Sequence, residues 1–145
     1  MSNNMSNDPP TVPSQALIRI LETLRFNGDG LIPAIAQQHD TGEILMMAWM
    51  NRDSIAETLK SGQVCYWSRS RGKLWRKGES SGQEQRLKDF RWDCDADTLL
   101  LLVDQKGVAC HTGRKNCFFN AIRDGEVAVI SDVETDPKEL YGSKK

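Results

Sequence analysis

Two apolar runs, residues 31–38 and 43–50, are separated only by His39-Asp40-Thr41-Gly42. A four-residue loop that contains glycine, between two such runs, is typical of a β-hairpin. The pair therefore predicts two antiparallel strands, with His39 at the surface in the connecting loop. This hairpin constrains the fold, because it indicates a sheet in which strands that are neighbours in the sequence pair with each other.

The rest of the chain alternates between short helical and short extended patterns. Ser14 can cap a helix that ends at residues 27–30, and Asn51 or Asp53 can cap a second one that Gly62 stops. Strand patterns follow at residues 63–68, 87–93 and 98–104, a polar loop at 69–85, and a last hairpin at 121–130. Because helices and strands do not alternate regularly, we expect an α+β fold, with a mainly antiparallel β-sheet and a few short helices.

The composition is that of one ordinary globular domain. The chain has 145 residues, a net charge of −1, 39% hydrophobic and 27% charged residues, so bulk charge favours neither a nucleic-acid nor a membrane partner. We expect residues 1–13 to form a disordered arm, 14–131 a single domain, and 132–145 an acidic, loosely held tail. The N-terminal residues do not have the pattern of a signal peptide. We therefore expect a cytoplasmic protein whose four cysteines stay reduced.

Three aspartates alternate with other residues in the segment Asp93-Cys94-Asp95-Ala96-Asp97. In an extended segment, residues two apart share a face, so the carboxylates would lie together and Cys94 would face away from them. Carboxylates this close repel one another unless a cation lies among them. We expect magnesium, which accepts a few carboxylates and keeps water or substrate phosphates as further ligands. A solvated acidic turn is the alternative.

Three cysteines, Cys94, Cys110 and Cys117, lie near these aspartates in the sequence. Thiolates suit zinc, and a set of three leaves a fourth position open, as in catalytic zinc sites. The alternative is that they are buried small side chains, which is the interpretation we favour for Cys65. Zinc bound by three thiolates acidifies a water less than zinc bound by neutral imidazoles, so a nearby base is needed. His111 is the candidate base, and a structural or zinc-binding histidine is the alternative.

Residues 69–91 are basic, with eight basic and three acidic side chains, a net charge of +5. Tryptophans lie among them, and guanidinium groups beside indoles suit a phosphorylated ligand that carries a flat base. Arg114 and Lys115 predict a second anion site. A solvated charged loop is the alternative. The residues that we expect to bind such a substrate are Trp67, Arg69, Arg71, Trp75, Arg76, Lys77, Arg114 and Lys115.

Taken together, these segments resemble the phosphoribosyl-AMP cyclohydrolase family of histidine biosynthesis. The resemblance covers residues 27–125 in order. Because the chain ends soon afterwards, we expect the single-function form, without the pyrophosphatase domain that is fused to it in some members. The blocks that carry the resemblance are Met47-Ala48-Trp49-Met50-Asn51, Tyr66-Trp67-Ser68-Arg69-Ser70-Arg71, Leu74-Trp75-Arg76-Lys77-Gly78-Glu79-Ser80-Ser81-Gly82, Asp93-Cys94-Asp95-Ala96-Asp97 and Cys110-His111-Thr112-Gly113-Arg114-Lys115-Asn116-Cys117-Phe118.

The resemblance implies a specific reaction and two metals. The reaction is hydrolysis of the N1–C6 bond in the adenine ring of phosphoribosyl-AMP, which gives the ring-opened formimino-aminoimidazole carboxamide ribotide. The implied ligands are Cys94, Cys110 and Cys117 for zinc, and the three aspartates for magnesium. The resemblance also implies a homodimer with metal sites at the subunit interface, in which Cys94 comes from one subunit and the other two cysteines come from its partner. His111 would then be the base that helps deprotonate the attacking water.

Two other functions compete with this hypothesis. A zinc-stabilised nucleic-acid-binding module would explain the basic segment with its tryptophans, but the aspartates would repel a phosphate backbone. A magnesium-dependent phosphohydrolase with merely structural cysteines would explain the aspartates, and it would release inorganic phosphate. The cyclohydrolase reaction leaves both phosphates of the substrate in place, so phosphate release distinguishes the two.

Overall fold

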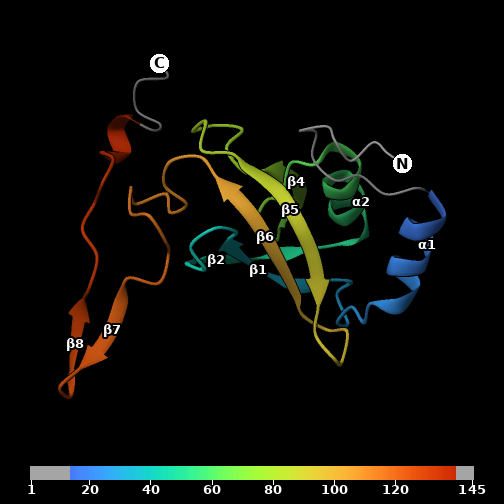
Figure 1. Cartoon of the computed structure of the whole chain (residues 1–145), viewed down its shortest axis with the longest axis horizontal. Helices are drawn as coiled ribbons and strands as arrows, with labels where there is room; N and C mark the ends of the chain where they lie inside the picture. Colours follow the sequence, from blue (N-terminus) through green and yellow to red (C-terminus); the bar gives the residue numbers. More distant parts are fainter. Residues whose placement is uncertain (1–13, 140–145) are drawn as a thin grey trace.

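The computed structural model describes residues 14–139 (Figure 1). The predicted arm at residues 1–13 and the last six residues of the predicted tail lie outside the described residues. The elements in chain order are α1 (Ser14–Thr23), β1 (Ile32–Gln38), β2 (Ile44–Met50), α2 (Arg52–Ser61), β3 (Cys65–Ser68), β4 (Lys73–Arg76), β5 (Gln85–Trp92), β6 (Leu99–Gln105), β7 (Asn120–Arg123) and β8 (Glu126–Val129).

Six strands form one sheet in the order β4-β3-β2-β1-β6-β5. The predicted hairpin is present as β1 and β2, and every neighbouring pair in the sheet is antiparallel except β1 and β6. The sheet curls, and two hydrogen bonds show it. The N–H of Val64 donates to the Gln85 carbonyl at 3.0 Å, and the N–H of Leu87 donates to the Gly62 carbonyl at 2.8 Å. These bonds join edge strand β5 to the segment just before β3. The predicted α+β class with a mainly antiparallel sheet is confirmed.

Helix α2 begins and ends where local chemistry predicts. The Asn51 side chain accepts from the N–H of Ser54, and the Ser54 hydroxyl accepts from the N–H of Asn51, which makes a reciprocal capping box. Gly62 ends the helix in the left-handed region, with φ of 80°. The helix buries Ile55 and Leu59 in the core that it shares with the sheet. Asn51, one of the two predicted caps, is the one that the structure uses.

The sequence prediction missed one strand. β4 lies inside the segment predicted as a polar loop, and it pairs with β3 so that Trp75 lies opposite Tyr66. The strand is short and flanked by glycine-containing turns. Its pairing with β3 stabilises it, because its own sequence lacks a clear alternation of apolar and polar residues. It carries Trp75 and leads directly into Lys77, so the missed strand is part of the candidate site.

A two-stranded hairpin, β7 and β8, extends away from the main sheet (Figure 1). The hairpin predicted at residues 121–130 is confirmed there, with its turn at Asp124 and Gly125. Its apolar side chains are exposed, with Ile122 and Val127 75% and 83% accessible. Within residues 14–139 no helix is long and apolar enough to cross a membrane.

Candidate active site

The segment between β6 and β7 carries two of the cysteines in a narrow loop, residues 109–117, which we call the cysteine loop. The N–H of Cys117 donates to the Leu45 carbonyl on β2 at 2.7 Å, which fastens the loop to the main sheet. The Thr112 hydroxyl donates to Cys110 Sγ at 3.2 Å. Cys110 is buried and Cys117 is half-buried. The loop therefore presents two thiols that are largely withdrawn from water.

These two thiols differ in their affinity for the proton. Burial first, and then the charge of Cys110 and the hydrogen bond with it, raise the pKa of Cys117 to about 12. Burial also acts to raise the pKa of Cys110. Hydrogen bonds from Thr112 and from Cys117, together with the charge of Lys77, outweigh that effect and leave this pKa below its ordinary value. A thiol with a lowered pKa therefore lies beside one with a raised pKa, and a cation bound at both sulfurs would favour the thiolate form of each.

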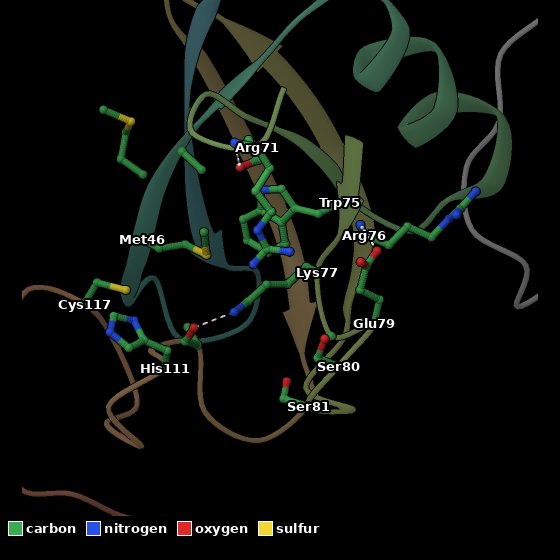
Figure 2. Close-up of a pocket in the computed structure, with 15 residues that line it drawn as sticks. Met46, Arg71, Trp75, Arg76, Lys77, Glu79, Ser80, Ser81, His111 and Cys117 are labelled. Atoms are coloured by element: carbon green, nitrogen blue, oxygen red, sulfur yellow. Dashed lines mark hydrogen bonds between the residues drawn. The ribbon is translucent and has the colours of Figure 1, made fainter. Parts of the chain in front are cut away.

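A cavity of about 400 Å³ opens beside this loop. Figure 2 shows His111 and Cys117 together on one side of it and Lys77 reaching across toward them. The Lys77 ammonium donates to the Ala109 carbonyl at 2.5 Å, and its own pKa is lowered by burial. On the other side lies the turn that carries Ser80 and Ser81. The cavity thus joins a thiol, an imidazole and a half-buried cation in one space.

Four of the predicted substrate-binding residues, Arg71, Trp75, Arg76 and Lys77, line this cavity. In Figure 2 the Arg76 side chain points away from the others, and it forms an ion pair with Glu57 on α2. The ammonium of Lys77 lies 5.8 Å from the Trp75 ring centroid. The structure therefore brings together a flat indole and two cations, Arg71 and Lys77, at the cavity wall.

The other predicted substrate-binding residues are not among those that line the cavity. The Arg69 guanidinium carbon lies 5.0 Å from the Trp49 ring centroid, and Lys115 forms an ion pair with Glu43 at 3.3 Å. Their roles in substrate binding stay predictions. These residues are Trp67, Arg69, Arg114 and Lys115.

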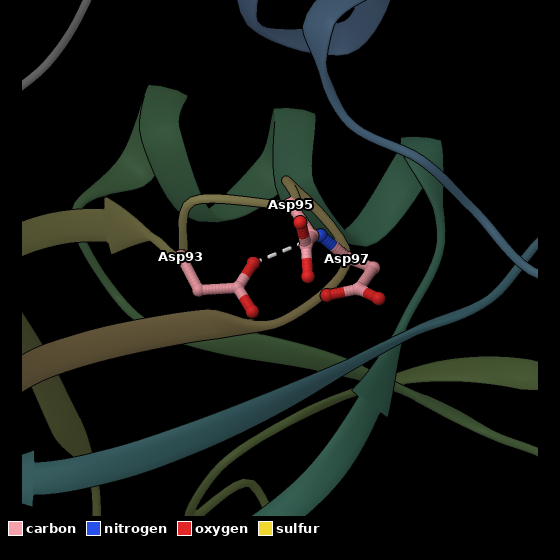
Figure 3. A group of neighbouring side chains, drawn as sticks. All are labelled: Asp93, Asp95 and Asp97. Atoms are coloured by element: carbon pink, nitrogen blue, oxygen red, sulfur yellow. Dashed lines mark hydrogen bonds between the residues drawn. The ribbon is translucent and has the colours of Figure 1, made fainter.

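The three aspartates converge, but not in the way that we predicted. Their carboxylate oxygens lie within 4.8 Å of one another (Figure 3). The segment is a tight turn between β5 and β6 rather than an extended strand, because Ala96 has a φ of 61° and its N–H donates to the Asp93 carbonyl at 3.0 Å. The prediction that Cys94 faces away from the aspartates assumed an extended strand, and that assumption is wrong. The carboxylate cluster itself is present.

The cluster is held by hydrogen bonds within the turn. The N–H of Asp97 donates to Asp93 Oδ1 at 3.0 Å. Slight burial acts to raise the pKa of Asp93. The hydrogen bond from Asp97 and other hydrogen bonds outweigh this effect and lower the pKa below the ordinary value of an aspartate. The pKa of Asp97 is raised, first by its hydrogen bond with Asp93, then by slight burial, and then by the neighbouring negative charges. Such mutual repulsion is relieved when a divalent cation binds, so the donor set fits magnesium.

Cys94 lies in this same exposed turn, at the opposite end of β6 from the cysteine loop (Figure 1). β6 runs from Leu99 to Gln105, and a strand of that length spans roughly 20 Å. Within residues 14–139, the aspartates are the one group of three or more potential ligands that a single chain brings together. Within one chain, Cys94 therefore lies apart from the Cys110–Cys117 pair.

A buried polar network behind the cavity had no counterpart in the sequence predictions. Gln85 is fully buried, accepts from the Tyr66 hydroxyl at 2.7 Å, and donates to Gln105 at 2.8 Å and to the Met46 sulfur at 3.3 Å. Met46 lines the cavity, so the network fixes part of its wall. Met46 directly precedes a block that carries the family resemblance, which is the only signal that could have found it. Gln85 stands in a polar stretch that looks like solvent-exposed loop.

Comparison with known proteins identifies the family of this chain. The family model for phosphoribosyl-AMP cyclohydrolase matches residues 46–119. The chain belongs to the phosphoribosyl-AMP cyclohydrolase family. A phosphoribosyl-AMP cyclohydrolase of Rhodospirillum centenum is 71% identical over 82% of this chain and 90% of the relative. One from Magnetococcus marinus is 68% identical over 84% of this chain and 95% of the relative. Phosphoribosyl-AMP cyclohydrolase 2 of Pseudomonas fluorescens is 67% identical over 85% of this chain and 84% of the relative. This membership favours the cyclohydrolase hypothesis over a nucleic-acid-binding module or a phosphohydrolase.

Proposed function

We propose that this protein hydrolyses the N1–C6 bond in the adenine ring of phosphoribosyl-AMP, an early step of histidine biosynthesis. The observation that carries the proposal is the cavity that unites Cys117 and His111 with a flat indole and two cations. Such a cavity suits a substrate with a flat base and phosphate groups. Membership of the cyclohydrolase family supports the same reaction.

We also propose two metal sites. Cys110 and Cys117, with Cys94 as third ligand, would hold zinc, and the fit rests on two neighbouring thiols that are shielded from water, one of which, Cys110, has a lowered pKa. The aspartates of the β5–β6 turn would hold magnesium, and the fit rests on carboxylate oxygens within 4.8 Å of one another. Zinc bound in this way supplies Lewis acidity and lowers the pKa of a water, so that a nucleophile is available near neutral pH.

The protein's own side chains orient the substrate and move the proton. Trp75 offers a surface for the adenine ring, and Arg71 and Lys77 offer positive charge to the phosphates. His111 is exposed to the cavity beside Cys117 and takes the proton of the attacking water. The water oxygen forms a bond to C6, the C6–N1 bond breaks, and the departing N1 receives a proton. Both phosphates remain on the product.

The zinc site requires a homodimer in this proposal. Cys94 and the Cys110–Cys117 pair lie at opposite ends of β6, so Cys94 of one subunit would complete the site of its partner. Exposed apolar side chains on β7 and β8, such as Ile122 and Val127, provide a surface of the kind that subunit interfaces bury. We further propose a cytoplasmic location, which keeps the cysteines reduced, with a phosphorylated nucleotide rather than nucleic acid or a membrane as partner.

Ultraviolet absorption of phosphoribosyl-AMP mixed with metal-loaded protein tests the reaction, because ring opening changes the chromophore. We expect a spectral change that disappears after chelation and in Cys110→Ala. Cys65→Ala is the matched control, since it removes a buried thiol outside the cavity, and it should keep the activity. Release of inorganic phosphate instead of a spectral change would support a phosphohydrolase. No reaction by protein shown to contain both metals would reject the proposed function.

A further inference from the structure

After the cysteine loop and Phe119, the chain forms the β7–β8 hairpin and returns. The N–H of Ile130 donates to the Phe119 carbonyl at 2.8 Å, which brings the returning chain back beside its point of departure. The next segment, residues 131–135, then lies against the cysteine loop. We call this segment the strap. It lies beyond residues 46–119, which match the family model.

The strap binds the cysteine loop through backbone hydrogen bonds to one residue. The N–H groups of Glu134 and Thr135 both donate to the Gly113 carbonyl, at 2.8 and 3.1 Å. The N–H of Gly113 in turn donates to the Cys110 carbonyl at 2.9 Å. A chain of backbone hydrogen bonds therefore runs from the strap to the residue that carries a candidate zinc-binding thiol.

Gly113 is shaped for this contact. It is buried and has a φ of 88°, a backbone conformation that residues other than glycine rarely adopt. A Cβ atom added here would lie 1.8 Å from the Thr135 carbonyl oxygen and 3.0 Å from Val133 Cγ1. The strap therefore occupies the space that any side chain at this position would need.

Arg114 provides a second attachment. Its Nε donates to the Ser131 carbonyl at 2.8 Å, and its guanidinium carbon lies 4.1 Å from the Phe119 ring centroid. The side chain is thus held between the start of the strap and Phe119, which lies just after the cysteine loop. Its contacts in this structure are with the protein's own backbone and ring, which gives it a role in fastening the strap.

We propose that residues 131–135 position the cysteine loop, and that Gly113 and Arg114 are positioning residues through which the strap holds Cys110, His111 and Cys117 in place for catalysis. The catalytic part of this proposal rests on the proposed function. The ordering of the cysteine loop by the strap can be measured without substrate or metal. The strap acts on the arrangement of these groups and takes no chemical part in the reaction.

The test compares alkylation of individual cysteines by iodoacetamide in folded, metal-free protein, followed by mass spectrometry. A chain that ends at Ile130 lacks the strap, and a chain that ends at Pro137 keeps it and serves as control. Cys110 should react at least tenfold faster without the strap, whereas Cys65, buried in β3, should be unchanged. Equal Cys110 rates in the two chains would overturn the proposal. A parallel rise at Cys65 would also overturn it, because the strap would then stabilise the whole fold.

A point substitution provides an independent comparison. Gly113→Ala should raise the alkylation rate of Cys110 as truncation does, because the added methyl group displaces the strap. Gly30→Ala is its control, since Gly30 has a similar φ of 77° but open space around a Cβ. Equal effects of the two substitutions would show that backbone strain, not the strap, is responsible.

Zinc affinity, measured by competition with a chromophoric chelator, should fall in the strapless chain and in Gly113→Ala. An affinity equal to that of the Pro137 chain would contradict the positioning role. If loop order depends on the strap while the wild-type protein does not act on phosphoribosyl-AMP, the strap stands and the proposed function fails.

Discussion

Among the residues of the site, Lys77 links the basic segment to the cysteine loop. Its ammonium donates to the carbonyl of Ala109, which is almost fully buried, and lies close to both thiols. A half-buried ammonium beside two sulfurs loses part of its hydration, so its position indicates a function at the site. The sequence placed Lys77 among the phosphate-binding candidates, and the structure adds this second contact.

Replacing Lys77 with Met should therefore damage the site more than the fold. We expect kcat/KM to fall at least tenfold, because the Ala109 carbonyl loses its donor, at a cost of about 1–3 kcal/mol, and the cavity loses a positive charge. Steady-state kinetics and thermal unfolding measure the two effects. Lys73→Met, an exposed lysine on β4, is the control. Equal kinetics for the two variants would show that the Lys77 contact has no catalytic consequence.

Cys65 allows a test of pH dependence away from the site. The side chain is 1% exposed, and burial raises its pKa to about 11 from a model-peptide value of 9.0. The folded state therefore keeps a proton that the unfolded state loses, so stability should fall as pH rises from about 9 to about 11, by up to about 2 kcal/mol. Urea unfolding across this pH range should give a flatter profile for Cys65→Ala. Parallel profiles would contradict the assignment.

At the scale of elements, the β5–β6 turn is a candidate metal site whose carboxylate cluster is assembled by local backbone geometry. Magnesium should raise the melting temperature by a few degrees, because it binds the folded carboxylate cluster and relieves its repulsion. Asp95→Asn should abolish most of this increase. Asp29→Asn, in an exposed turn elsewhere, should retain it. Scanning calorimetry with and without magnesium is the measurement, and an increase of the same size in both variants would place the ion elsewhere.

The elements also show what the sequence could predict. The first hairpin and helix α2 follow from local signals, a short glycine-containing loop and the Asn51 cap, and both are confirmed. β4 was missed because its pairing with β3 is a tertiary interaction. The alternating aspartates resemble a strand, but the left-handed conformation at Ala96 makes them a turn. No pattern of residue types encodes that local choice.

For the candidate site, residue chemistry was easier to predict than spatial arrangement. The thiols and His111 were identified because cysteine and histidine are rare and clustered in the sequence. The cavity position of Met46 and the buried Gln85 behind it depend on packing between distant segments, which periodicity does not reveal. The distance between Cys94 and the cysteine loop likewise follows only from the length and direction of β6.

At the scale of the whole molecule, the separation of Cys94 from the cysteine loop makes the zinc hypothesis testable by mixing two inactive chains. If each zinc site takes Cys94 from one subunit and Cys110 with Cys117 from the other, Cys94→Ala and Cys110→Ala homodimers both lack intact sites. In a mixed dimer, one site carries both substitutions and the other carries neither. Refolding an equal mixture should therefore restore about a quarter of wild-type activity, because half of the dimers are mixed and each has one intact site.

The control for this experiment is a mixture of Cys110→Ala with Cys117→Ala. Both substitutions affect the cysteine loop, so every site in their mixed dimers lacks one ligand and no activity should return. If the Cys94→Ala and Cys110→Ala mixture also stays inactive while size-exclusion chromatography shows dimers, Cys94 does not complete the partner's site. If recovery occurs in the first mixture alone, the active site is a property of the pair of subunits, which accounts for a turn and a loop at opposite ends of one strand.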